Sequence, residues 1–261
     1  MTMNILVCVK QVLDPEAAVA IDRDARWVAS GPETAYRMNR YDEFAVEAAV
    51  QLQENDTRIT VDVITVGPER SDAVLRRAMG MGADHGIHVT TDFEGPLDPR
   101  VTAAAVASVA RDRSCGLILA GVMSEDAMQG LVGPMAAECL GWPCATSVME
   151  MDVAGDRSAV AVEREMEGGR RDVLSIRLPA VITVQSGINT PRYPSLSNML
   201  RANRQPLDIL SADGLGLPTP LQAVTQVRRP EKSRAGLILG GSPEEKAQQL
   251  LGMFLERSFL G

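Results

Sequence analysis

The sequence predicts an α/β fold with a parallel sheet, added antiparallel strands and an extended C-terminal arm that ends in a helix. Two observations favour this fold. Short apolar runs rich in β-branched residues alternate with amphipathic helical stretches in the first half, and the pattern later changes to period-two alternation. Strands alternating with helices are typical of βαβ units and a parallel sheet. With 261 residues, 45% of them hydrophobic, the chain suffices for one large α/β domain plus an appendage, or for two modest domains.

The first half of the chain contains the predicted parallel unit. Three apolar runs suit strands that are buried on both faces, at residues 5–9, 59–66 and 116–120. Helical patterns lie between or beside them, at residues 42–52, 71–79 and 101–110. We expect a nucleotide-binding edge where the carboxyl ends of the parallel strands meet.

The pattern changes after Trp142-Pro143. Residues 146–153 and 159–166 alternate with period two and are joined by Ala154-Gly155-Asp156, which predicts a β-hairpin. Residues 172–178 and 179–184 are expected to return the chain to the sheet. A further helix is expected from about Met135.

The last part of the chain is predicted to be an arm. From residue 185 to about 241, apolar residues thin out while glycine, proline and arginine accumulate, so we expect much of this stretch to lie on another surface. Ser242 and Glu245 then form a capping box, with Pro243 at the first helical position. Apolar residues follow at helical spacing: Ala247, Leu250, Leu251, Phe254 and Leu255. Such a helix either docks on a partner or packs on its own domain.

Composition excludes several functional classes. A formal charge of −8 and a pI near 4.9 argue against nucleic acid as a partner, because its phosphates would be repelled at long range. The cysteines lack a CxxC pair, so we expect small buried hydrophobes and no zinc site or disulfide framework: Cys8, Cys115, Cys139 and Cys144. The N-terminal sequence resembles no targeting leader, so a bacterial cytoplasm is the expected location.

Two glycine-containing segments could bind a phosphate. Thr65-Val66-Gly67-Pro68 closes a predicted strand, and Ser71 opens a helix soon after. A glycine there admits a ligand to the backbone, and a helix N-terminus offers amide donors. Residues 121–134 repeat this arrangement on a larger scale, where an ordinary loop fits the spacing equally well. The candidate residues in this second segment are Gly121, Ser124, Asp126, Gly130 and Gly133.

No arrangement of residues indicates a catalytic site. The two histidines, His85 and His88, precede or begin a predicted strand and have no serine or cysteine elbow, so a structural role is expected. The chain also lacks a GxxxxGK[ST] loop and a GxGxxG turn after its first strand, the two commonest nucleotide motifs.

Four parts of the chain resemble, in the same order, the β (small) subunit of electron-transfer flavoproteins. These are residues 38–50, 76–89, 133–143, and 178–183 followed by 191–199. The most specific is Pro191-Arg192-Tyr193-Pro194-Ser195-Leu196. Together they cover most of residues 3–205.

The resemblance implies an electron-carrier subunit rather than an enzyme. It implies a domain of the adenine-nucleotide-hydrolase-like (Rossmann-like) type over residues 1–205, with a recognition loop at about 185–205, and an arm over residues 206–261 that docks on an α subunit. The α subunit would hold most of the redox FAD. This chain would bind AMP, or a second FAD in electron-bifurcating members. Electrons would come from a flavin dehydrogenase and pass to a membrane quinone oxidoreductase or another acceptor.

The resemblance also assigns roles to residues. Tyr41 would stand beside the flavin ring, and the phosphates would lie over residues 124–132, Val132 included. Leu196 would anchor the carrier on its dehydrogenase, with Arg192 either steering by charge or having a structural role. The adenosine half would contact Cys8, Val9, Met38, Asn39, Thr65, Val66 and Gly67.

One departure from the family pattern concerns the phosphate loop. Met128 and Leu131 stand where the common loop has a carboxylate and a glutamine, and a second family loop fits better. The identity of the nucleotide is therefore open. Two alternatives remain: a free-standing adenine-nucleotide-binding protein of the same superfold, and a structural subunit that has lost its nucleotide.

Overall fold

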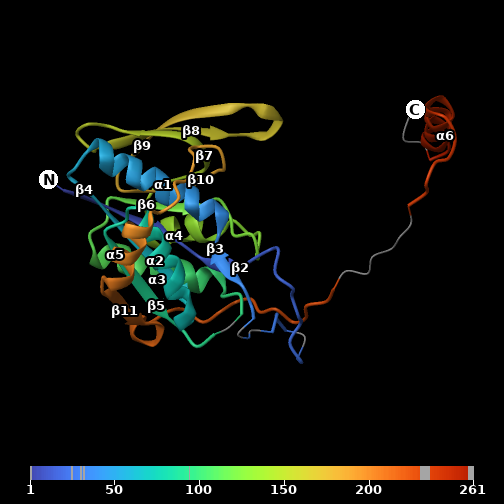
Figure 1. The fold of residues 1–261 in the computed structure, drawn as a ribbon. Helices are drawn as coiled ribbons and strands as arrows, with labels where there is room; N and C mark the ends of the chain where they lie inside the picture. The colour runs from blue at the N-terminus through green and yellow to red at the C-terminus, as the bar shows by residue number, and fades with distance from the viewer. Residues whose placement is uncertain are drawn as a thin grey trace. The chain divides into compact units, whose positions relative to one another are not determined.

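The computed structural model describes residues 2–24, 26–29, 31, 33–93, 95–229 and 236–257. The chain divides into two units, Met1–Val227 and Arg228–Gly261. Within the described residues, the first unit contains a nine-stranded sheet in the order β11-β5-β4-β1-β6-β10-β7-β8-β9. Neighbours from β11 to β7 pair in parallel, whereas β7, β8 and β9 pair antiparallel. The predicted α/β fold with a mostly parallel sheet is thus confirmed, and β8 and β9 form the upper edge in Figure 1.

The strands and helices have the following bounds. The sheet contains β1 (Met3–Cys8), β4 (Ile59–Gly67), β5 (His85–Thr90), β6 (Leu117–Gly121), β7 (Cys144–Val153), β8 (Ala159–Glu165), β9 (Arg171–Arg177), β10 (Ala180–Val184) and β11 (Leu207–Ser211). A separate antiparallel pair consists of β2 (Gln11–Leu13) and β3 (Tyr36–Met38). The helices are α1 (Arg40–Asn55), α2 (Asp72–Met81), α3 (Pro99–Asp112), α4 (Val132–Leu140), α5 (Leu196–Arg204) and α6 (Pro243–Glu256).

The central parallel strands of the sheet, β1, β4, β6 and β10, are covered on both faces, which explains their continuously apolar sequences. Ile5 and Val7 of β1 belong to a core cluster with residues of α1 and α2. Leu6, between them, belongs to a second cluster with residues of α3 and α4. All three are fully buried, because successive side chains of a strand point to opposite faces.

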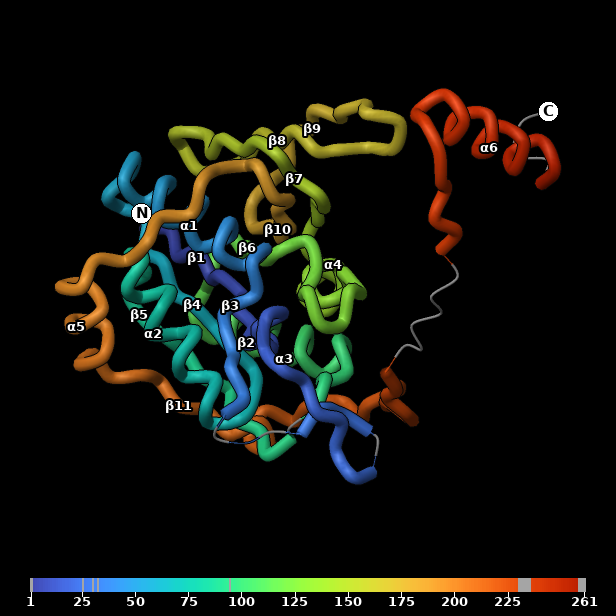
Figure 2. The backbone as a smooth tube through the Cα atoms, turned by 45° about the vertical axis from the view of Figure 1, so that its right-hand side comes forward, coloured from blue at the N-terminus to red at the C-terminus, as the bar shows by residue number. Residues whose placement is uncertain are grey.

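Part of the stretch that was expected to lie on another surface packs on elements of its own chain. Helix α5 packs on α2, and β11 pairs in parallel with β5 from Leu207 opposite Gly86 to Ser211 opposite Thr90. Figures 1 and 2 both show α5 and β11 beside α2 and β5. The first unit extends to Val227, beyond the boundary expected at residue 205. A short strand at a sheet edge needs few apolar residues, so the composition of this stretch did not indicate β11.

The second unit contains α6, which begins as the sequence predicts. Ser242 and Glu245 form the reciprocal capping box, and Pro243 occupies the first turn. No described residue of this helix is buried, and Leu251 and Leu255 are more than half exposed. Among the described residues, no helix is long and apolar enough to cross a membrane.

One cysteine differs from expectation. Cys139 is exposed near the end of α4, whereas Cys115 is buried and Cys8 and Cys144 are partly buried. Burial raises the pKa of the Cys115 thiol to about 12, with a smaller contribution from the charge of Asp62. The exposure of Cys139 arises because it lies on the outer side of a short helix whose other face, with Ala136 and Ala137, is buried.

Candidate functional site

A pocket lies where β1, β4 and β6 end, which are three neighbouring parallel strands. This is the edge at which parallel sheets of α/β proteins bind ligands. The pocket is lined by most of the residues that the sequence indicated: Cys8, Val9, Asn39, Val66, Gly67, Gly121, Ser124, Asp126, Gly130, Val132 and Gly133.

Three expected site residues do not line this pocket. Met38 and Thr65 are almost fully buried. Tyr41 is half-buried in the first turn of α1, and its Cβ would lie 2.6 Å from a Cβ placed on Gly121. Gly121 therefore permits the close approach of α1 to the end of β6. The role of Tyr41 beside a flavin stays a prediction.

Asn39 holds the loop that follows β6. Its Nδ2 donates to the carbonyl oxygen of Met123 at 2.9 Å, and its Oδ1 accepts from the amide of Glu125 at 3.0 Å. Arg37 of β3 adds two hydrogen bonds to the Glu125 carboxylate, at 2.9 and 3.0 Å. The candidate phosphate loop is thus fixed by side chains that precede α1 in the sequence.

Lys10 is a pocket residue that the sequence reasoning missed. Its Nζ lies 2.7 Å from an oxygen of the Asp126 carboxylate and donates to the hydroxyl of Ser124 at 3.2 Å. The pair is partly exposed, with relative side-chain exposures of 38% and 14%. A signal existed, because Lys10 follows a predicted strand at its carboxyl end. This pair places a cation at the loop where we expected the phosphates.

Asp42 joins the ends of two strands and was also missed. One oxygen of its carboxylate accepts from the amide of Lys10 at 2.8 Å, and the other accepts from the amide of Gly121 at 3.2 Å. Burial raises the pKa of Asp42 to about 7, although these hydrogen bonds and one from Asn39 oppose the rise. The carboxylate therefore holds together the two segments that carry Lys10 and the candidate phosphate loop.

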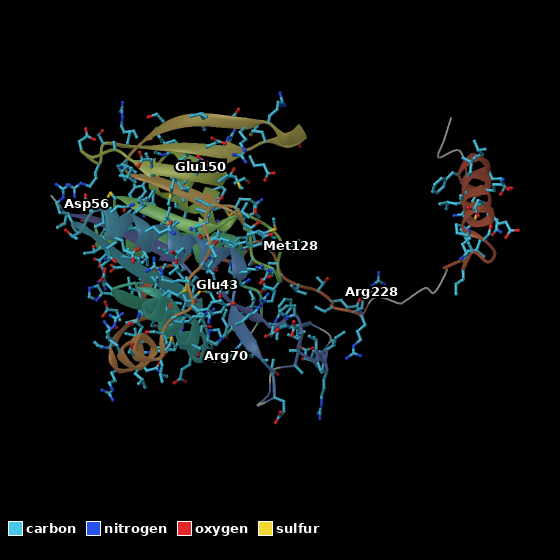
Figure 3. All side chains as sticks on the ribbon, turned by 45° about the horizontal axis from the view of Figure 1, so that its top comes forward. Glu43, Asp56, Arg70, Met128, Glu150 and Arg228 are labelled. Atoms are coloured by element: carbon cyan, nitrogen blue, oxygen red, sulfur yellow. The ribbon has the colours of Figure 1, made fainter. Side chains whose placement is uncertain are left out.

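The loop after β6 has backbone features suited to an anion. Gly130 has a φ of +62° and Met128 a φ of +54°, and helix α4 begins at Val132 without a side-chain cap. Its N-terminal amides can therefore serve a bound anion. A Cβ on Gly133 would overlap Cγ2 of Thr183 in β10, so this glycine lets α4 pack closely on the sheet. Met128 itself is 67% exposed, and its side chain is labelled in Figure 3.

The segment after β4 forms the opposite side of the pocket. Gly67 lies there with Ser71, whose Oγ would be 2.8 Å from a Cβ on Gly67. His88 has the expected structural position: it is buried, its Nε2 donates to the Gly67 carbonyl at 3.0 Å, and its Nδ1 contacts the Asp72 carboxylate. The histidine thereby fixes the turn that leads into α2.

Aromatic side chains line the same pocket, although no sequence pattern indicated them. They come from three separate segments that only the fold brings together: Trp27, Tyr36 and Phe93. The guanidinium carbon of Arg70 lies 4.5 Å from the centre of the Tyr36 ring, within cation–π range. The pocket thus combines an aromatic region with a loop rich in backbone amides, which suits a ligand with a ring and a phosphate.

The two residues expected at a partner surface differ in their surroundings. Leu196 is 78% exposed, and it is the first residue of α5 rather than the tip of a loop, because Ser195 caps the helix through the amide of Asn198. Arg192 bonds instead to two carboxylates of α1, those of Glu47 at 2.8 Å and Glu54 at 2.6 Å. These bonds favour the structural interpretation of Arg192.

Comparisons with known proteins match this chain to one family. Residues 29–214 match the model of the electron transfer flavoprotein domain. The electron transfer flavoprotein subunit beta of Methylophilus methylotrophus is 35% identical, over 94% of this chain and 96% of that protein. The subunit beta of Bacillus subtilis is 33% identical, over 96% and 97%. That of Bos taurus is 32% identical, over 90% and 92%.

Proposed function

The chain belongs to the electron transfer flavoprotein family, among its β subunits, and from this premise we propose that it binds an adenine nucleotide in the pocket described above. It pairs with an α subunit that holds most of the redox FAD. The assembled carrier accepts electrons from one or more flavin dehydrogenases and passes them to a membrane quinone oxidoreductase or another acceptor. The nucleotide is AMP or a second FAD.

The observation that carries the nucleotide proposal is the convergence on one pocket of the uncapped N-terminus of α4 and the loop of residues 121–130. Among the charged side chains that line it, Lys10 is paired with Asp126, so a phosphate would meet little unpaired positive charge there. Backbone amides then supply most of its hydrogen bonds, as in other glycine-containing anion sites. The loop can do this without the carboxylate and glutamine that Met128 and Leu131 replace.

The direct test is to purify the two-chain complex, denature it and identify the released nucleotides by chromatography and mass spectrometry. We expect an adenine nucleotide in about equal amount to this chain, in addition to the redox FAD. AMP, or FAD at twice the expected amount, would support the proposal. A complex that carries electrons but releases only one FAD would instead support a structural subunit that has lost its nucleotide.

Charge substitutions can locate the nucleotide. Lys10→Met leaves the Asp126 carboxylate unpaired beside the phosphate, so nucleotide retention should fall, whereas Lys10→Met combined with Asp126→Asn should restore most of it. Gly155→Ala, in the β7–β8 turn with no atom within 4 Å of the added carbon, is the matched control. Equal nucleotide retention in the wild type and in all three variants would indicate that the phosphate lies elsewhere.

Helix α6 supports the pairing with an α subunit. Its apolar residues include Leu250, Leu251, Phe254 and Leu255, each at least 39% exposed, and no other helix or strand lies in the described part of its unit. An apolar helix face of this kind is usually covered by a partner. Leu251→Lys should weaken co-purification with the α subunit, whereas Gln249→Lys on the opposite side should not. Unchanged co-purification of both variants would refute this assignment.

A further inference from the structure

The family resemblance implies that Leu196 anchors the carrier on its electron-donating dehydrogenase, and we propose a docking surface around this residue. The position of Leu196 depends on how α5 packs against α2. The C-terminal half of α5 is fastened by side chains that bond to backbone carbonyls. A guanidinium nitrogen of Arg76 donates to the carbonyl of Ala202 at 2.7 Å and to that of Gln205, and Arg201 donates to the carbonyl of Met79 at 3.2 Å. Ala202 is fully buried at this contact. These bonds fix the end of the helix that is farther from Leu196.

The N-terminal half of α5 is held differently, against a glycine. Gly80 lies inside α2, and its φ is not in the left-handed region, so the backbone conformation does not require glycine. Apart from proline, glycine is the poorest former of helix interiors. A Cβ at this position would overlap Sδ of Met199 and would lie 3.2 Å from Cβ of Pro194. Atoms of Met199 and Pro194 therefore occupy the space that a side chain at position 80 would fill.

We propose that Gly80 is a positioning residue for the docking surface, an inference that rests on the proposed role of Leu196. Pro194 and Met199, the two side chains that contact Gly80, lie on either side of Leu196 in the sequence. When both are seated against α2, the outer face of the segment is left to solvent. Tyr193 is 88% exposed, Leu196 78% and Leu200 51%. Gly80 thus sets the height and orientation at which these three side chains are presented.

A side chain at Gly80 would act on the two contacts unequally. Met199 is flexible and can turn its sulfur away, but it then loses its contact with α2. The ring of Pro194 is rigid and must move together with the backbone that leads to Leu196. Alanine should therefore shift the start of α5 slightly, and leucine should lift it. Helix α2 itself should be no less stable, because both residues form helices better than glycine does.

The test uses the purified two-chain carrier with Gly80→Ala, Gly80→Leu and the remote control Gly155→Ala. Hydrogen exchange measured by mass spectrometry should become faster at residues 191–200 in the two Gly80 variants only. Docking is measured as the carrier concentration that half-saturates a purified flavin dehydrogenase able to reduce the wild-type carrier. We expect this concentration to rise about fivefold for alanine and more for leucine, as overpacking would produce. Flavin content and kcat at saturating carrier should be unchanged.

Rescue separates positioning from general destabilisation. Met199→Ala removes the sulfur that the new methyl group would meet, so Gly80→Ala with Met199→Ala should recover most of the docking lost in Gly80→Ala. Wild-type docking by Gly80→Leu, or loss of flavin in Gly80→Ala without rescue, would overturn the proposal. Leu196→Ala distinguishes failure of the docking surface from failure of the role of Gly80. Wild-type docking by Leu196→Ala would reject the docking surface itself. Weakened docking by Leu196→Ala together with unaffected Gly80→Leu would reject only the role of Gly80.

Discussion

Replacing Asp42 with asparagine should change how the stability of the chain depends on pH. Burial raises the pKa of Asp42 from an ordinary value of 3.8 to about 7. Between these two values the folded protein keeps a proton that the unfolded chain has lost, so stability falls as pH rises. The loss is about 1.4 kcal/mol for each pH unit. Raising the pH from 5 to 8 should therefore remove about 2 to 3 kcal/mol from the free energy of unfolding of the wild type.

An asparagine side chain cannot ionise, so the Asp42→Asn variant should lack this loss. The amide side chain can still accept one hydrogen bond but not both of those from Lys10 and Gly121, which lowers stability by an amount that does not depend on pH. Urea unfolding of the two-chain complex at several pH values separates the two effects. The difference in unfolding free energy between variant and wild type should shift by about 2 to 3 kcal/mol in favour of the variant from pH 5 to pH 8.

Asp98 offers a control, because its pKa is shifted in the opposite direction to that of Asp42. Burial alone would raise the pKa of Asp98, but the amides of Arg100, Leu221 and Gln222 lower it. Asp98 therefore stabilises the folded protein at pH values above its unfolded pKa, and this contribution is lost only in acid. The unfolding free energy of Asp98→Asn should accordingly run parallel to that of the wild type from pH 5 to pH 8. Parallel curves for Asp42→Asn as well would show that Asp42 ionises at its ordinary pH, and would refute the reasoning.

Three further predictions concern docking, the ion pairs of Arg192 and the glycines. Leu196→Ala should weaken docking on the donor dehydrogenase roughly tenfold, by ~1 to 2 kcal/mol, with unchanged flavin absorbance and melting temperature; unchanged transfer at limiting carrier would count against an anchor. Arg192→Met should lower the free energy of unfolding in urea by about 3 kcal/mol, because it leaves the buried Glu47 carboxylate without its partner. Adding Glu47→Gln should recover much of this loss. An unchanged free energy of unfolding in Arg192→Met would show that the ion pair contributes nothing. Gly67→Val should expel the nucleotide, measured after denaturation, whereas Gly133→Val should mainly lower the melting temperature by displacing Thr183; the reverse pattern would contradict both assignments.

The sequence predicted the centre of the sheet because the central strands are buried on both faces. Residues 5–9, 59–66 and 116–120 lie in or next to β1, β4 and β6, and a run of apolar β-branched residues has few other structures open to it. The hairpin was equally clear from its period and turn. By contrast, β11 has only five residues at a sheet edge, and α5 buries only Ala202 completely. Elements that bury so little leave weak periodicity in the sequence.

The candidate site was predictable where glycines mark the backbone and not where side chains meet from distant segments. Gly67 and Gly121 each end a strand, so their place beside a pocket follows from topology. The pairing of Lys10 with Asp126 joins residues 116 positions apart, and that of Arg70 with Tyr36 joins two distant segments. No local pattern indicates such pairs. Gly133 lines the pocket as the sequence indicated, but its close packing on Thr183 was not evident from the sequence.

Helix α2 relates the pocket to the docking surface. Ser71, which lines the pocket, immediately precedes the helix, and Gly80 contacts the α5 segment near its other end. At about 1.5 Å per residue the two positions are roughly 14 Å apart along the helix axis. A continuous packed helix fixes the distance between two sites, but it carries a signal only if it has a second stable arrangement. The described contacts of α2 include that of Asp72 with His88 at its start and that of Arg76 with Ala202 in its middle, and none of them indicates a second arrangement. Effects of substitutions at Gly67 and Gly80 should therefore add, because sites this far apart without shared partners behave independently.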